Sequence, residues 1–168
     1  AVLDTAIATK YEDEDNMAGA IDMAQRAIAS AQGFAPAAAL LARLLGKEGE
    51  QKKAISVLEK AWGRTPHPAL SAAFLDLLSN ESVNSRTKKV THFIKQNPDH
   101  RESVLLKIEE NLRSGDAVTA WSMLSPMVKD EDATARLCLL AAEAETMLSN
   151  EADAKVWALR AATAPVEP

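Results

Sequence analysis

The sequence predicts an all-α fold, a single array of about five helix–turn–helix units that spans residues 1–168. Three observations predict it. Alanine and leucine, with 32 and 19 residues, are abundant and favour helix. A β-sandwich or barrel of this length would need more Val, Thr, Tyr and Gly than the chain contains. Small and large apolar residues recur about every 34 residues, so that five units account for nearly the whole length.

The composition excludes several classes of protein. A formal net charge of −5 and a pI near 5.3 argue against a general nucleic-acid binder, which would carry a basic excess. The single cysteine cannot form an internal disulfide. No apolar run approaches the roughly 18 residues that cross a bilayer. Because the chain begins with Ala1 rather than methionine, we expect it to be part of a longer protein.

The apolar spacing predicts ten helices in five pairs. Pro36 and Pro68 suit the first turn of a helix, where the missing N–H does no harm, and Asp99 and Asp116 suit the N-cap. The expected helices are 2–11 and 16–31, 36–48 and 50–63, 67–79 and 83–96, 100–113 and 116–128, and 131–149 and 151–163.

The clearest unit begins at Ala35. Small residues at Ala42 and Ala54 let its two helices approach closely, Gly49 suits a left-handed turn between them, and Pro66 ends the second helix. The residues in register are Ala38, Leu41, Ala42, Leu45, Gly49, Ala54, Leu58, Ala61 and Pro66. This spacing resembles the tetratricopeptide repeat (TPR), and the resemblance implies a TPR-like right-handed α-solenoid.

The other units match this pattern less completely. We expect a single repeat domain with units at about 1–34, 35–66, 67–98, 99–132 and 133–166. The third unit is shorter by two residues, whereas Gly115 and Ala120 restore the spacing in the fourth. Alanine also recurs by chance in a chain this rich in it, so an ordinary antiparallel helical bundle stays as the alternative fold.

No motif of an enzyme or metal site is present in the sequence. The histidines His67, His92 and His100 lack the spacing of metal ligands, and His67 suits a turn-capping role. Cys138 lies in an apolar run and is expected to be buried. Paired carboxylates, such as those of the acidic stretch 12–15, are typical of solvated helix ends. We therefore expect no catalytic, cofactor-binding or metal-binding residues and no cofactor.

Two further groups of side chains have a structural and a functional interpretation. The three tryptophans are expected to pack between helices rather than to form a partner surface; they are Trp62, Trp121 and Trp157. A basic group indicates a solvated face or, alternatively, a patch that docks an acidic partner or lipid headgroups. Its members are Arg86, Lys88, Lys89 and Lys95.

In such a solenoid the first helix of each pair lines a concave face, which is where peptides bind. The groove positions fall on Ala39, Arg43 and Lys47 in the second unit, and near Leu139, Glu143 and Thr146 in the last. The candidate protein-binding residues are therefore Arg43, Lys47, Leu139 and Glu143. The set of Lys, Asn and Arg residues by which chaperone-binding TPR domains hold a carboxylate is not visible at these positions.

Several stretches resemble the C-terminal TPR region of alphaproteobacterial HemY-type proteins. They are Leu58-Glu59-Lys60-Ala61-Trp62, Pro66-His67-Pro68-Ala69-Leu70, Glu81-Ser82, His100, Glu102-Ser103, Gly115-Asp116, Ala135-Arg136-Leu137-Cys138-Leu139-Leu140-Ala141, Glu145, Trp157 and Ala164-Pro165. Asn80 and Asn84 depart from the family pattern. The resemblance implies a bacterial parent protein held at the inner membrane by an N-terminal anchor, with a scaffold role linked to haem and tetrapyrrole biosynthesis. The flavin-dependent oxidase of the same name is excluded, because a dinucleotide-binding glycine motif is missing.

Three functions are compatible with these observations. The first is a non-enzymatic protein–protein interaction scaffold that holds a partner, such as an enzyme of haem synthesis. The second is an oligomerisation module whose solenoid ends pair with each other. The third is a carrier that holds a porphyrin or its precursor in the concave groove.

Overall fold

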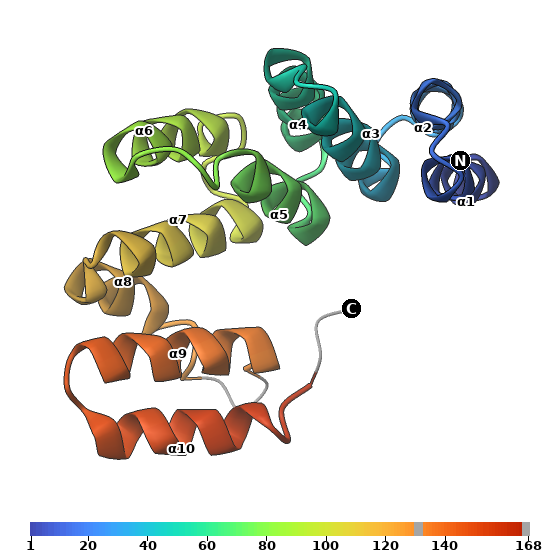
Figure 1. The fold of residues 1–168 in the computed structure, drawn as a ribbon. Helices are drawn as coiled ribbons and strands as arrows, with labels where there is room; N and C mark the ends of the chain where they lie inside the picture. The colour runs from blue at the N-terminus through green and yellow to red at the C-terminus, as the bar shows by residue number, and fades with distance from the viewer. Residues whose placement is uncertain (130–132, 166–168) are drawn as a thin grey trace. The chain divides into compact units, whose positions relative to one another are not determined.

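The computed structural model describes residues 1–129 and 133–165, and within them it contains ten helices and no strand (Figure 1). The all-α prediction is confirmed. The helices form two compact units, Ala1–Ser103 and Val104–Pro168, with the boundary in the first turn of α7. The helices are α1 (Val2–Asp13), α2 (Met17–Ser30), α3 (Ala35–Lys47), α4 (Gln51–Arg64), α5 (Pro68–Leu77), α6 (Val83–Ile94), α7 (Arg101–Ser114), α8 (Ala117–Leu124), α9 (Ala135–Met147) and α10 (Glu151–Ala161).

Two of the helices are shorter than the sequence predicts by five residues or more. The helix expected over 116–128 ends at Leu124, because Pro126 has no N–H with which to continue the helical hydrogen bonds. The helix expected from residue 131 begins at Ala135, where the Thr134 hydroxyl caps it by accepting the Leu137 N–H at 3.5 Å. Residues 131 and 132 of that prediction lie outside the described residues.

Most of the predicted helix starts are confirmed. Pro68 occupies the first turn of α5, and His67 caps this helix because its Nδ1 accepts the Ala69 N–H at 3.0 Å. Asp116 caps α8 by accepting the Thr119 N–H at 3.1 Å. The prediction for Asp99 is wrong: α7 begins at Arg101, and the His100 Nδ1 accepts the Glu102 N–H at 3.1 Å.

Four of the connections between paired helices share one turn geometry. Each contains a residue with positive φ, and the next residue donates its N–H, at 2.8 Å, to the carbonyl five residues earlier. Within each unit the two turns are 34 residues apart. The positive-φ residues are Asp15 (59°) and Gly49 (76°) in the first unit, and Gly115 (90°) and Ser149 (64°) in the second.

In the first unit, α3 packs against α2, α4 and α5, and α1 packs against α2 and α3. Gly46 permits the close approach of α3 to α5, because a Cβ at this position would lie 2.6 Å from Leu77 Cδ2. The core contains an aromatic cluster: Phe93 stacks on Phe74 at 4.0 Å and lies 4.7 Å from Trp62, between ring centroids.

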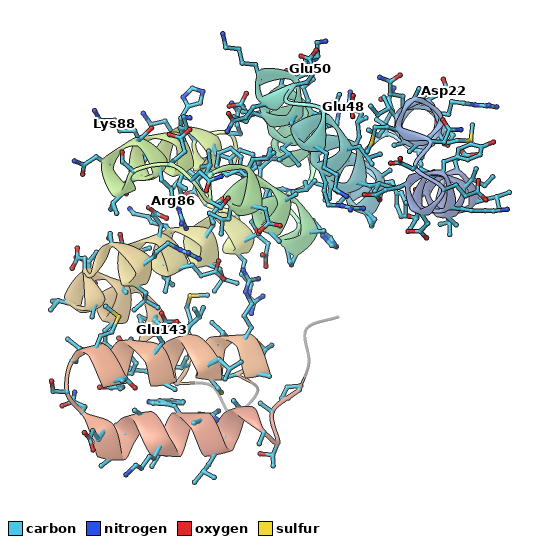
Figure 2. The ribbon with its side chains drawn as sticks, viewed as in Figure 1. Asp22, Glu48, Glu50, Arg86, Lys88 and Glu143 are labelled. Carbon is cyan, nitrogen blue, oxygen red and sulfur yellow. The ribbon has the colours of Figure 1, made fainter. Side chains whose placement is uncertain are left out.

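The basic group on α6 is not a uniformly solvated face (Figure 2). Arg86 is buried, with 7% of its surface exposed, so the solvated-face interpretation is wrong for this residue. Lys89 forms an ion pair with Glu81, the residue before the N-cap of α6. Lys88 and Lys95 are exposed, as expected.

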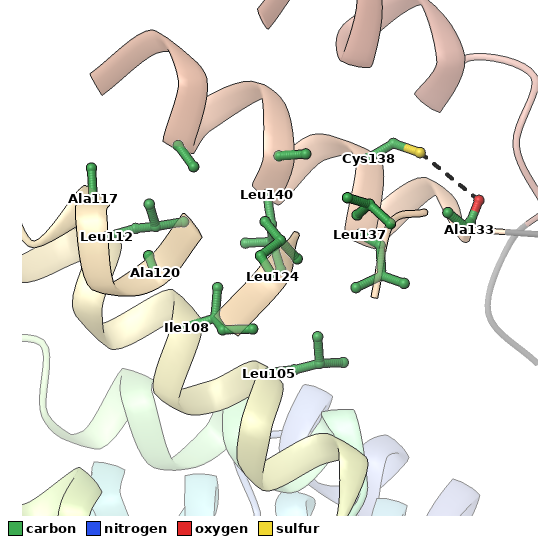
Figure 3. Packing of buried hydrophobic residues seen from close by; sticks show 13 residues of the cluster. Leu105, Ile108, Leu112, Ala117, Ala120, Leu124, Ala133, Leu137, Cys138 and Leu140 are labelled. Atoms are coloured by element: carbon green, nitrogen blue, oxygen red, sulfur yellow. Dashed lines mark hydrogen bonds between the residues drawn. The ribbon is translucent and has the colours of Figure 1, made fainter. Parts of the chain in front are cut away.

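The core of the second unit is built by α7, α8 and α9, with α10 packed on α9 (Figure 3). Cys138 is fully buried there, as predicted, and its Sγ lies 3.8 Å from the Ala133 carbonyl. Trp121 and Trp157 pack against this core and lie edge-to-face with each other, with their ring centroids 6.4 Å apart. The three tryptophans therefore pack between helices, as the sequence predicts. None of the described helices has the length and apolar character that a membrane span requires.

Candidate functional site

The first unit carries a groove of about 890 Å³ that runs along α1, α3 and α5. Within this unit these are the first helices of the predicted pairs, so the groove lies where the sequence predicts a binding face. Its lining consists of Thr5, Thr9, Pro36, Ala39, Leu40, Arg43, Gly46, Lys47, Gly49, Gln51, Ala69, Ala72, Ala73, Asp76, Leu77, Ser79, Asn80 and Glu81.

Small residues form much of the groove wall. Ala39 of α3 lines it together with Ala69, Ala72 and Ala73 of α5. Since methyl groups project little from a helix, a partner can lie close to the two helix backbones. Such a surface suits an extended or helical segment of chain, whose own side chains supply the contacts.

Arg43 and Lys47 lie in this groove, one turn apart on α3, and both bind Glu12 of α1. The Arg43 guanidinium donates from Nη1 and Nη2 to the two carboxylate oxygens of Glu12, each at 2.6 Å, and Lys47 Nζ donates at 2.7 Å. The cationic side chains are about half exposed, at 47% and 52%, whereas the Glu12 side chain is 10% exposed. The two cationic side chains that are predicted to bind a partner thus already bind a carboxylate of the same chain, while about half of their surface remains exposed.

The charge of Glu12 is stabilised by this arrangement. Burial acts to raise the pKa of Glu12, but the hydrogen bonds from Lys47 and Arg43 and their positive charges outweigh it. The pKa of Glu12 therefore lies below its ordinary value of 4.5. Glu12 remains ionised at neutral pH and joins α1 to α3.

The end of the groove beside the α5–α6 turn carries negative charge, opposite in sign to the charge of Arg43 and Lys47. Asp76 and Glu81 line it there. Hydrogen bonds from Lys89 and Ser85 hold the pKa of Glu81 below its ordinary range. The side-chain Nε2 of Gln51, at the start of α4, donates to the Leu77 carbonyl at 2.8 Å. This hydrogen bond holds the C-terminal end of α5 against α4. The groove therefore offers cations on α3 and carboxylates at the end of α5.

The predicted positions of the last unit lie on α9. Leu139 is 58% exposed. Glu143 is exposed on the same helix (Figure 2). Met147, one further turn along, is 41% exposed, so these residues form an accessible stripe at a spacing of four. The Thr146 hydroxyl donates a hydrogen bond to the Ala142 carbonyl of the same helix.

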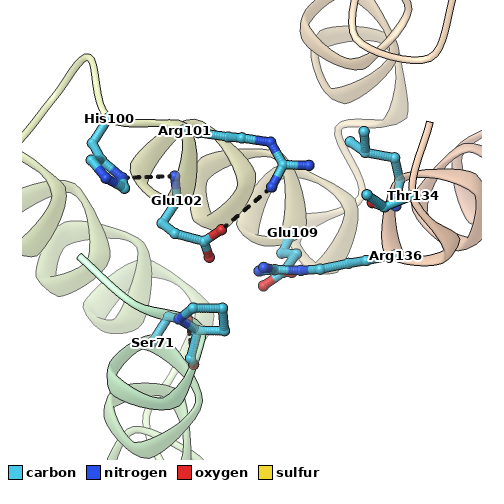
Figure 4. Close-up of polar contacts among 9 residues, drawn as sticks. Ser71, His100, Arg101, Glu102, Glu109, Thr134 and Arg136 are labelled. Carbon is cyan, nitrogen blue, oxygen red and sulfur yellow. Dashed lines mark hydrogen bonds and ion pairs between the residues drawn. The ribbon is translucent and has the colours of Figure 1, made fainter. Parts of the chain in front are cut away.

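An ion pair joins α7 to α9 in this unit (Figure 4). Arg136 donates from Nε and Nη2 to Glu109 Oε1 at 3.1 and 2.8 Å, and both side chains are about a quarter exposed. This bond joins the first helices of two successive predicted pairs, as the bond between Arg43 and Glu12 does in the first unit.

Sequence reasoning missed the partner of the predicted cations. Glu12 belongs to the acidic stretch that was expected to be solvated, yet it lies 31 and 35 residues before Arg43 and Lys47, close to one repeat length. That separation places the residues on equivalent turns of adjacent first helices, and it is the signal that could have identified the contact. In the described part of the chain, no group of three or more His, Cys, Asp or Glu side chains is arranged to hold a metal ion.

Comparison of the chain with protein-family models, with curated proteins and with solved structures gives no significant match. The groove is therefore interpreted from its own geometry and chemistry.

Proposed function

We propose that this chain is a non-enzymatic protein–protein interaction module, built from TPR-like helical repeats, that binds a segment of a partner protein in the groove of α1, α3 and α5. The observation that carries the proposal is the groove itself: about 890 Å³ of space on the first helices of successive pairs, with alanines on its wall and charges of both signs. A chain segment with complementary charges would fit this surface.

The helix turns support the repeat interpretation. Two pairs of turns with positive φ recur 34 residues apart, each with the same backbone hydrogen bond. In the first unit, α3 contacts both its own pair member α4 and the next first helix α5. Contact of each hairpin with its neighbour is the packing that repeat proteins use to bury their apolar faces.

The resemblance to HemY-type proteins indicates which partner would bind in the groove. By this resemblance the partner is an enzyme of haem or tetrapyrrole biosynthesis, and an anchored parent protein would hold it at the bacterial inner membrane. In this proposal the chain brings an enzyme to the membrane and takes no part in the reaction.

A peptide array tests both the groove and the partner class. Overlapping peptides from haem-biosynthesis enzymes would be probed with the purified chain, and affinities for bound peptides would be measured by fluorescence anisotropy. Ala72→Arg, at an exposed groove alanine of α5, is expected to weaken binding at least tenfold. Ala158→Arg, at an exposed alanine of α10, is the matched control and is expected to leave binding unchanged. Equal effects of the two substitutions would exclude the groove as the binding site.

Exposed apolar side chains on α10 favour self-association as a second candidate function. Val156 and Leu159 are 61% and 74% exposed on this helix. Sedimentation velocity over a concentration range tests it: self-association predicts a rising mean mass that Leu159→Glu abolishes. A constant monomer mass up to high concentration would rule it out.

A further inference from the structure

We propose that a second pocket of the first unit, between α2, α3 and α4, binds a small amphipathic carboxylate, namely a medium-length alkyl chain that ends in a carboxylate. The pocket has a volume of about 330 Å³ and does not share the lining of the groove, so the proposal is independent of the proposed function. Ligand pockets span about 300–1,000 Å³, and a pocket at the lower limit suits a short chain rather than a large ring system.

The interior of the pocket is apolar. Its apolar lining comes from all three helices and from the connection before α3. The lining residues are Ile28 of α2, Phe34 just before α3, Ala38 and Leu41 of α3, and Val57 and Ala61 of α4. Leu41 and Ala38 are buried, whereas Ile28, Phe34, Val57 and Ala61 are only partly buried. Four partly exposed apolar side chains around one hollow gain free energy when an alkyl chain removes them from water.

The rim of the pocket is cationic. Lys60 and Arg64 lie one turn apart on α4, and both are exposed and line the pocket. Among the described lining residues there is no carboxylate, so these cations differ from Arg43 and Lys47, which bind Glu12. An apolar interior below two cations without a carboxylate between them is complementary to an anionic head on an apolar tail.

The start of α3 adds to the preference for an anion. Gly33 and Phe34 line the pocket, and α3 begins directly after them without a side-chain N-cap. The N-terminal end of a helix carries partial positive charge, which favours a nearby carboxylate. The lining of the pocket therefore includes a helix N-terminus and two cationic side chains.

Decanoate, below its micelle concentration, is the probe that tests this site. Backbone amide chemical shifts of the intact chain would be followed during titration with decanoate, decanol and decyltrimethylammonium. Saturable decanoate binding is expected, with the largest shifts at pocket residues and with affinity rising about fourfold for each methylene from hexanoate to decanoate. Decanol is expected to bind about tenfold more weakly, and decyltrimethylammonium more weakly still. Equal affinity of all three ligands, or shifts centred outside the pocket, would overturn the proposal.

Matched variants separate the charge from the apolar interior. The double variant Lys60→Met and Arg64→Met is expected to weaken decanoate binding about tenfold and to leave decanol binding unchanged. The double variant Lys52→Met and Lys53→Met removes the same charge from α4 outside the pocket, and it is expected to bind as the wild type does. Ala29→Phe fills the pocket from an exposed position of α2, so it is expected to abolish binding while the circular dichroism spectrum stays unchanged. Full binding by Ala29→Phe, or an equal loss in both double variants, would contradict the assigned site.

Discussion

The repeated turn geometry predicts how substitutions at the positive-φ positions change stability. Replacing a glycine there with alanine should destabilise the protein, whereas replacing a larger residue there with glycine should stabilise it. Gly49 has a φ of 76°, and a Cβ built on it would meet no atom within 4 Å. The substitution Gly49→Ala therefore tests backbone conformation alone, without a steric clash. Left-handed backbone costs an L-residue about 1–2 kcal/mol. Alanine offsets about 0.4–1 kcal/mol of this by restricting the unfolded chain. We expect a net loss of about 1 kcal/mol.

Ser149 occupies the corresponding turn of the second unit, with a φ of 64°. Ser149→Gly removes the same strain, so it is expected to stabilise the protein by about 0.5–1 kcal/mol. Gly63 is the control, because it is an exposed residue of α4 without positive φ. Gly63→Ala is expected to stabilise by about 0.5–1 kcal/mol, since alanine is the better helix former.

Urea unfolding, followed by circular dichroism, measures the three free energies of unfolding. In thermal scans a change of 1 kcal/mol corresponds to about 2–4 °C for a chain of this size. The distinguishing result is the sign: Gly49→Ala destabilises, whereas Gly63→Ala and Ser149→Gly stabilise. If Gly49→Ala and Gly63→Ala changed stability in the same direction, the shared left-handed turn would be refuted.

Substitutions at an ion pair, in the aromatic core and at a helix N-cap are each expected to destabilise the first unit. Glu12→Gln removes the charge that Arg43 and Lys47 bind, so it is expected to cost about 1 kcal/mol at neutral pH. Because the pKa of Glu12 is lower in the folded state, this stability is present above the ordinary carboxyl pKa and is lost as the pH falls through the folded value. Urea unfolding at about pH 7 and about pH 3 should therefore show a larger difference between wild type and variant at the higher pH; an equal difference at both would contradict the ion pair. Phe93→Ala is expected to cost about 3–5 kcal/mol and to alter the near-ultraviolet circular dichroism of Trp62, and a loss below about 1 kcal/mol would show that Phe93 is not a central core residue. Asn16→Ala removes the side chain that accepts the Gly19 N–H at 3.0 Å, and it is expected to cost about 1 kcal/mol in the same unfolding assay; an unchanged midpoint would refute the cap.

The helices could be predicted from the sequence because they depend on local signals. Alanine and leucine at helical spacing mark their interiors, and Pro68, Asp116 and Gly49 mark starts and turns whose physical cause lies within a few residues. The two large errors at helix ends were also local. Pro126 was overlooked as the residue that ends α8, and the Thr134 cap was missed at the start of α9.

The groove could be predicted only in part. Ala39, Arg43 and Lys47, which the register of the second unit places on the first helix, line it. The contribution of α5 was missed, since the third unit is shorter and its turn does not share the positive-φ geometry of the other four. The Glu12 contact and the burial of Arg86 depend on how helices pack against one another, which no local pattern specifies.

The proposed function requires that the groove of α1, α3 and α5 receives a segment of a partner protein. Amide chemical-shift mapping, with an array-selected peptide titrated into the labelled chain, tests this most directly. The largest shifts are expected on α3 and α5, around Ala39, Arg43 and Ala72. Large shifts confined to α4 and α6, or to α10, would contradict it.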